Sequence, residues 1–147
     1  MMKGKKTFSW AAISLGVIFL AVRLIVNVDT AYSDRHISQQ ELAFKDKAVE
    51  MMNIDTDKAK PAYMRDVYDG DTSKLSPDVR YQCSAALKAL ALDGTHRNGD
   101  FMPLFFIEGN DKVSIALKHN DGTLTLAEFD ISEKNPLKTN QIVKEEE

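Results

Sequence analysis

One apolar segment, residues 8–28, constrains what this chain can fold into more than any other feature. The segment contains a single charged residue, Arg23, and the residues before it, 1–7, include three lysines and no acid. A helix needs roughly 20 predominantly apolar residues to cross the hydrocarbon core of a bilayer. We therefore predict a transmembrane helix over residues 8–28.

Two side chains are predicted to anchor this helix, Trp10 near its start and Arg23 near its end. Arg23 precedes Asp29 by six residues, which places it near one interface at about 1.5 Å per residue. There its guanidinium can extend outward into the headgroups. Basic flanks stay on the cytoplasmic side, so the sequence predicts a bacterial inner-membrane (plasma-membrane) protein with residues 1–7 in the cytoplasm and the remainder exported.

A cleaved signal peptide is the alternative interpretation of the same segment. The small residues Ala31 and Ser33 fit a cleavage site. An apolar core of 7 to 15 residues is typical of a signal peptide, and the segment here is longer. An uncleaved anchor followed by a connector, residues 29–37, is therefore preferred, while removal of residues 1–33 stays open; in both cases the domain is exported.

The charge of the exported part excludes nucleic acid as its natural partner. Residues 1–28 hold four of the 19 Lys and Arg residues and none of the 22 Asp and Glu residues, which leaves the rest with a formal charge of −7. Nucleic-acid binding relies on clustered basic residues, whereas the lysines here alternate with acids. The predicted partners are the membrane and another protein, and self-association stays open.

Helical patterns occupy the first half of the exported part. Ser38 and Glu41 have the spacing of a capping box, which predicts a helix over residues 38–52 with one apolar face. Residues 57–68 also have helical spacing, interrupted by Pro61. Ser76 and Pro77 fit the first positions of a further helix that ends at Asp93-Gly94.

Strand patterns follow. Residues 101–108, 113–118 and 123–131 are β-prone or alternate in polarity, and turn residues separate them. The predicted fold is therefore an α+β domain over residues 38–132, with two or three helices packed as one layer on a three- to four-stranded antiparallel meander. Residues 133–147 are predicted to form a mobile acidic tail, in which residues 141–143 are suited to an added edge strand.

Cys83 is the only cysteine, so no disulfide within the chain can stabilise the domain. It falls on the apolar face of the helix that begins near Ser76, which favours a buried thiol, although pairing between chains stays open. A Cys–His–Asn set with His96 or His119 and Asn120 can be drawn, but an apolar setting opposes thiolate formation. No catalytic motif is present, so the domain is predicted to be non-enzymatic and to need no cofactor.

Two acidic patterns are weak candidates for a metal site. Asp121 to Glu128 resembles the second half of an EF-hand loop, but counting back from Gly122 places Leu117 where the first ligand should be. Asp69 and Asp71 lie around Gly70, where turn formation is the simpler explanation. The sequence therefore predicts no metal site.

The leading hypothesis for function is a single-pass membrane protein whose exported acidic domain binds a protein partner, as an envelope-complex component or as an inhibitor or immunity factor. The alternative is a sensor or ligand-binding domain with an apolar cavity between the helices and the sheet. Both hypotheses assign the ligand or partner surface to the same five residues: Met51, Met52, Phe101, Phe105 and Phe106.

Overall fold

The computed structural model describes residues 38–68 and 75–147. The chain divides into two compact units, Met1–Ser38 and Gln39–Glu147, and the second contains every helix and strand described below. The predicted membrane segment 8–28 with Trp10 and Arg23, the connector, Asp69 and Asp71 all lie outside the described residues. Among the residues that are described, no helix is long and apolar enough to span a membrane.

Two long helices form where the sequence predicts them. Helix α2 covers Gln39–Met52, and helix α4 covers Pro77–Leu92. The side chain of Ser76 accepts a hydrogen bond from the Val79 N–H at 3.3 Å, and Pro77 occupies the first turn, where its missing N–H costs nothing. Asp93 caps the C-terminal end of α4, and Gly94 follows with a φ of 83°, the left-handed conformation that glycine adopts most readily.

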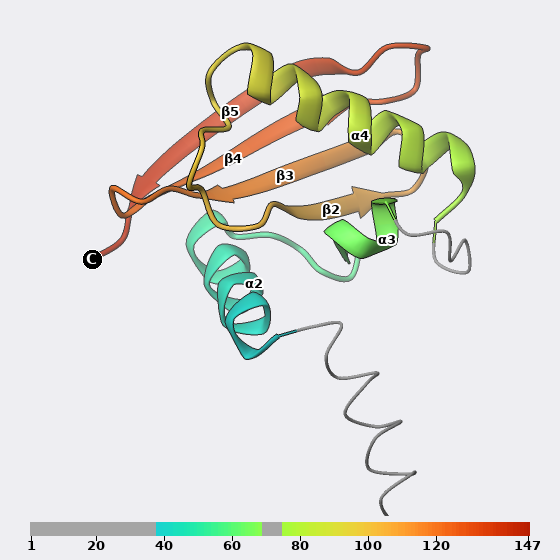
Figure 1. The fold of residues 1–147 in the computed structure, drawn as a ribbon. Helices are drawn as coiled ribbons and strands as arrows, with labels where there is room; N and C mark the ends of the chain where they lie inside the picture. The colour runs from blue at the N-terminus through green and yellow to red at the C-terminus, as the bar shows by residue number, and fades with distance from the viewer. Residues whose placement is uncertain (1–37, 69–74) are drawn as a thin grey trace, which may run out of the picture. The chain divides into compact units, whose positions relative to one another are not determined.

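The sheet has five antiparallel strands in the order β1-β2-β3-β4-β5, so the prediction of three to four strands was wrong. Strands β2 Leu104–Glu108, β3 Lys112–Lys118 and β4 Thr123–Asp130 form the predicted meander (Figure 1). The two extra strands are β1 Lys60–Tyr63 and β5 Leu137–Glu145, and they add one edge each. Strand β5 occupies most of the segment that was predicted to be a tail.

Strand β1 replaces the first part of the helix that spacing suggested over residues 57–68. Only Met64–Tyr68 is helical, as the short helix α3. Pro61 cannot donate the backbone hydrogen bond that a helix interior needs, and an edge strand tolerates it. Pairing of Pro61 with Phe106 and of Tyr63 with Leu104 places this segment beside β2, so a tertiary contact overrides the local helical spacing.

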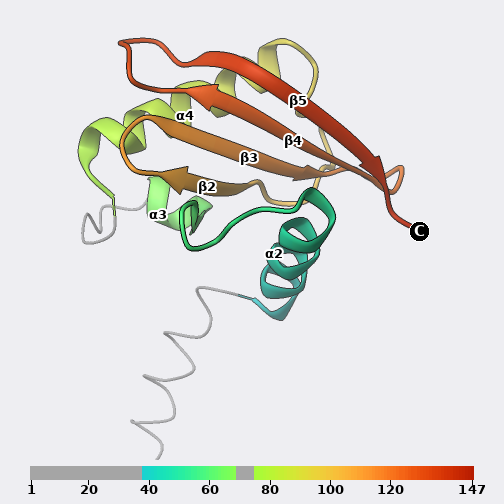
Figure 2. The ribbon, with the colours of Figure 1, turned by 180° about the vertical axis from the view of Figure 1, so that it is seen from behind.

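Helices cover both faces of the sheet, whereas the sequence predicted a single helical layer. Figures 1 and 2 show α4 on one face and α2 on the other. Successive residues of a strand point to opposite faces of the sheet. Because a helix covers each face, the first four residues of β2 are all buried. The core on the α4 face includes Val79, Cys83, Ala86, Leu87, Leu90, Phe105, Ile107, Val113, Ile115, Leu117, Ala127 and Phe129.

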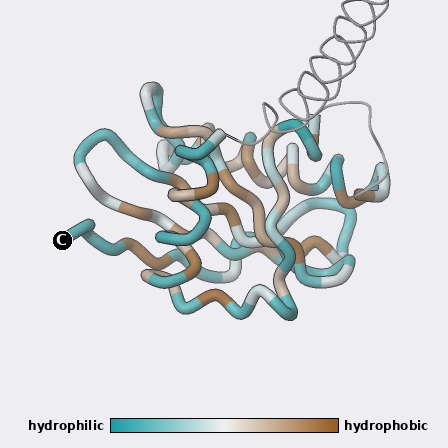
Figure 3. The backbone as a smooth tube through the Cα atoms, turned by 90° about the horizontal axis from the view of Figure 1, so that it is seen from below, coloured by the Kyte–Doolittle hydropathy of each residue, from teal (hydrophilic) through white to brown (hydrophobic). Residues whose placement is uncertain are grey.

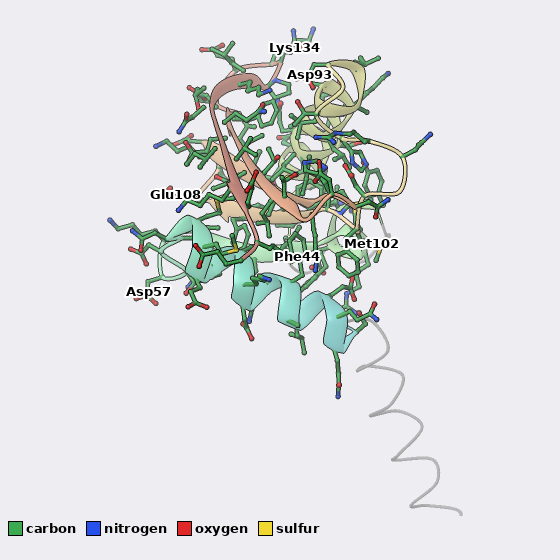
Figure 4. The ribbon with its side chains drawn as sticks, turned by 90° about the vertical axis from the view of Figure 1, so that its left-hand side faces the viewer. Phe44, Asp57, Asp93, Met102, Glu108 and Lys134 are labelled. Atoms are coloured by element: carbon green, nitrogen blue, oxygen red, sulfur yellow. The ribbon has the colours of Figure 1, made fainter. Side chains whose placement is uncertain are left out.

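On the α2 face, the buried strand residues are Tyr63, Leu104, Phe106, Ala116, Leu124 and Leu126, and α2 contributes Phe44, Ala48 and Met52. These helix residues recur every four positions, so they form one stripe. Figure 4 shows Phe44 between α2 and the sheet, and Figure 3 shows hydrophobic residues running through the middle of the domain. The core is therefore two apolar layers separated by the sheet.

Candidate functional site

The structure does not bring the five predicted surface residues together into one cavity. Phe105 and Phe106 are 0 % and 1 % exposed and point to opposite faces of the sheet, because they are neighbours in β2. Met52 is buried on the side of α2 that faces the sheet, and its neighbour Met51 is half-buried. Core packing accounts for Phe105, Phe106 and Met52. Met51 lines one pocket beside α2, and Phe101 lines a different pocket next to the α2 face.

That pocket is called here the aromatic–lysine pocket. It has a volume of about 490 Å³ and is lined by Gln40, Ala43, Phe44, Lys47, Phe101 and Lys118. The four residues from α2 occupy positions i, i+3, i+4 and i+7 and so share one face of the helix. The volume lies in the range that is usual for small-molecule sites, about 300–1,000 Å³.

Two aromatic rings form the apolar wall of this pocket. The rings of Phe44 and Phe101 meet edge to face, with centroids 5.5 Å apart and planes at 83°. This is a favourable geometry for aromatic pairs. The Phe101 N–H donates to the Lys118 carbonyl at 2.9 Å, which fixes Phe101 beside the end of β3.

Two lysines from different elements meet one carboxylate at the rim of the pocket. A Glu146 carboxylate oxygen lies 3.2 Å from Lys47 Nζ and 3.5 Å from Lys118 Nζ. This oxygen is buried and accepts no well-directed hydrogen bond, so the two contacts are ion pairs. Burial raises the pKa of the Glu146 carboxyl, but Lys47 and Lys118 outweigh it, and the pKa is lowered overall.

A second cluster of chemically active groups is buried behind the loop between α4 and β2. Asp100 contacts both histidines of this region: its Oδ2 lies 3.3 Å from His96 Nδ1, and its Oδ1 lies 2.9 Å from His119 Nδ1. His119 Nε2 is 2.8 Å from the Thr125 hydroxyl. The sequence did not predict this cluster, because the loop that carries His96 and Asp100 meets the segment that carries His119 and Thr125 only in the folded chain.

The order acid, imidazole and hydroxyl in this cluster resembles that of a nucleophilic triad, but its burial opposes catalysis. The side chains of His119 and Asp100 are both 2 % exposed, and Thr125 is equally buried. No substrate can therefore reach the hydroxyl without unfolding of the loop. Burial raises the pKa of the Asp100 carboxyl, but the Arg97 N–H at 2.7 Å and the two histidines lower it overall.

Cys83 takes no part in a catalytic set. It is a free thiol, fully buried in the core between α4 and the sheet, as the sequence predicted. Burial raises its pKa to about 12, so the thiolate is scarce near neutral pH. His119 is directed to Asp100 and Thr125 instead, and the drawn Cys–His–Asn set is not assembled.

The structure places the acidic candidates Asp121 and Glu128 apart. Asp121 accepts hydrogen bonds from the Thr123 N–H and hydroxyl, and it pairs with Arg97 at 3.3 Å. The Thr123 hydroxyl is the main cause that lowers the pKa of Asp121, to about 2. Glu128 lies farther along β4 and accepts from Asn140. Among the described residues, no group of three or more His, Cys, Asp or Glu side chains is arranged to hold a metal ion.

The two edges of the sheet differ in accessibility. Strand β1 is four residues long, includes Pro61 and is half-buried, which limits the pairing that a further strand could make. Strand β5 is nine residues long, and eight of the nine are exposed. Leu137 and Val143 on β5 are 67 % and 56 % exposed, so this edge presents both backbone and apolar side chains to solvent.

Sequence reasoning missed the lysines and the carboxylate of the pocket rim. Lys47 and Lys118 are polar residues within segments whose apolar residues alone predicted a helix and a strand. Glu146 follows β5 directly, and the Glu146 N–H donates to the Gly122 carbonyl at 2.9 Å. Only the return of β5 along β4 brings Glu146 to these lysines, so no local pattern indicates the site.

Comparisons with known proteins give no relative of this chain. No family model, no curated protein and no solved structure matches it significantly. Function is therefore inferred from the residues and their geometry.

Proposed function

We propose that this chain is a single-pass inner-membrane protein whose exported, non-enzymatic domain binds a protein partner at the β5 edge. The observation that carries the proposal is the nine-residue exposed edge strand. An extended segment of another protein can extend a sheet at such an edge, since backbone hydrogen bonds supply affinity and side chains supply selectivity.

The charges around β5 indicate the kind of segment that fits. Lys138 Nζ is engaged by Asp93 at 3.1 Å, and Lys144 Nζ donates to the Met51 carbonyl. Glu145 and Glu147, at the end of the same edge, are exposed. The expected partner is therefore an extended segment that is uncharged along most of β5 and carries basic residues opposite Glu145 and Glu147. This agrees with the acidic composition of the exported part.

Site-specific photocrosslinking in intact cells tests the edge directly. A photoreactive residue at Thr139 or Val143 on β5 is expected to capture one defined protein, and the same residue at Lys88, exposed on α4, is expected to capture none. Val143→Lys should abolish capture from Thr139, since a charge at this edge hinders strand addition. The exposed Tyr81→Lys on α4 is the matched control.

Equal capture from α4 and β5, or capture only of a second copy of the chain, would refute a separate partner at β5.

The membrane assignment has its own test with two engineered cysteines, Lys3→Cys and Glu147→Cys. A membrane-impermeant maleimide applied outside intact cells should label Glu147→Cys alone, because Cys83 is buried. Labelling of Lys3→Cys from outside would reverse the proposed orientation.

A further inference from the structure

We propose that the aromatic–lysine pocket binds a small carboxylate with an apolar body, and that Glu146 occupies its lysines when no such molecule is bound. This site lies on the α2 face and is distinct from the β5 edge. Its proposed role depends on neither the membrane segment nor the protein partner.

The wall of the pocket can bind the apolar body of the ligand. Phe44 and Phe101 already meet edge to face, and Ala43 leaves room beside them on α2. An aromatic or aliphatic group placed there removes apolar surface from water at about 25 cal/mol per Å². The aromatic pair itself favours a further ring in an edge or offset position.

The two lysines can bind the carboxylate of the ligand. Lys47 and Lys118 come from opposite sides of the pocket, one on α2 and one on β3, yet both lie within 3.5 Å of the same Glu146 oxygen. Each lysine side chain is about 40 % exposed, so a molecule in solution can reach them. The lysine pair therefore already binds a carboxylate, supplied by the chain itself.

Glu146 acts as an internal competitor in this arrangement. Its backbone is held by one hydrogen bond to Gly122, at the turn before β4, and its side chain is 18 % exposed. A ligand carboxylate must displace it, and the apparent affinity is reduced by the fraction of time that the lysines are occupied. Removing the Glu146 charge should therefore strengthen binding, which a purely structural ion pair would not do.

Isothermal titration of the full chain in lipid nanodiscs tests the proposal, with empty nanodiscs as the control for partitioning. The probe is 3-phenylpropanoate, which joins one ring to one carboxylate and dissolves in water. The matched neutral probe is 3-phenylpropan-1-ol. The carboxylate is expected to bind and the alcohol to bind at least tenfold more weakly, since the alcohol cannot pair with the lysines.

Four variants define the site. Lys47→Met and Lys118→Met keep the apolar stems and remove the charges, and each should weaken binding of 3-phenylpropanoate about tenfold or more, as for loss of a charged hydrogen bond. Glu146→Gln should strengthen binding about tenfold if Glu146 occupies the lysines for about nine-tenths of the time. Glu147→Gln, at an exposed neighbour, should leave binding unchanged.

Protection of Cys83 from maleimide shows whether each variant is folded, because this thiol is fully buried. Binding seen only with Glu146→Gln would support the proposal, since the competitor then masks the site in the natural chain. Equal binding of the acid and the alcohol, weaker binding by Glu146→Gln, or no binding by either the natural chain or Glu146→Gln would overturn it. None of these outcomes bears on capture at β5, so the two proposals fail separately.

Discussion

Replacing Asp100 by alanine should destabilise the domain more than any exposed substitution. The Asp100 carboxylate accepts from the Arg97 N–H at 2.7 Å and contacts His96 and His119 at 3.3 and 2.9 Å. A hydrogen bond to a charged group contributes about 1.5–3 kcal/mol, and a buried polar group left without a partner costs about 1–3 kcal/mol. In Asp100→Ala, water can reach the exposed Arg97 N–H but not the buried His119. The expected loss in the free energy of unfolding is therefore about 3–5 kcal/mol.

The lone buried cysteine supplies the assay for this prediction. The full chain is equilibrated in urea, and Cys83 is labelled by a short pulse of maleimide, which reacts only after the core opens. With a denaturant slope of about 2 kcal/mol per molar urea, a loss of about 4 kcal/mol lowers the midpoint of labelling by about 2 M. The exposed Asp111→Ala is the control and should shift the midpoint little.

Asp100→Asn separates the charge from the hydrogen bonds. Its amide oxygen can still accept from Arg97, and its amide N–H can donate to His119 in the tautomer whose Nδ1 is an acceptor. Asp100→Asn should therefore cost less than Asp100→Ala, and its deficit should shrink toward low pH, where the natural carboxylate is itself protonated. A midpoint for Asp100→Ala within 0.3 M of the Asp111→Ala control would refute the importance assigned to this cluster.

The remaining predictions concern the thiol, two loop glycines and acid stability. At pH 8 and without urea, Cys83 should remain unlabelled for hours by 5,5′-dithiobis(2-nitrobenzoate), because burial raises its pKa to about 12; rapid labelling would contradict the burial. Gly94→Ala and Gly99→Ala should each cost about 1–2 kcal/mol in the urea assay, because both glycines have positive φ and the Cβ added at Gly99 meets only the exposed Asn120 amide, which can turn away; an unchanged midpoint for both variants would contradict this strain. The pKa values of Asp100, Asp121 and Glu146 are all lowered by folding, so their ionised forms stabilise the fold above the unfolded pKa values, and stability should fall as pH drops below about 4.5. A urea midpoint that rises on acidification would contradict this sign.

The elements that local patterns determine were predicted from the sequence. Helices α2 and α4 follow from apolar residues at helical spacing and from the cap at Ser76, and β2, β3 and β4 follow from β-prone runs separated by turns at Gly109 and Gly122. Burial of Cys83 followed from its place on the apolar face of α4. In each case the signal lies within one segment, so no knowledge of distant contacts was needed.

Only the tertiary structure decided which segments become edges and which polar groups meet. Strand β1 forms although its spacing is helical, because pairing with β2 and Pro61 at the edge outweigh local preference. Strand β5 has few apolar residues, and its pairing with β4 brings Glu146 to Lys47 and Lys118. The aromatic–lysine pocket and the Asp100 cluster both join residues distant in sequence, and no periodicity within a segment encodes such contacts, because they depend on how the two helical layers are placed on the sheet.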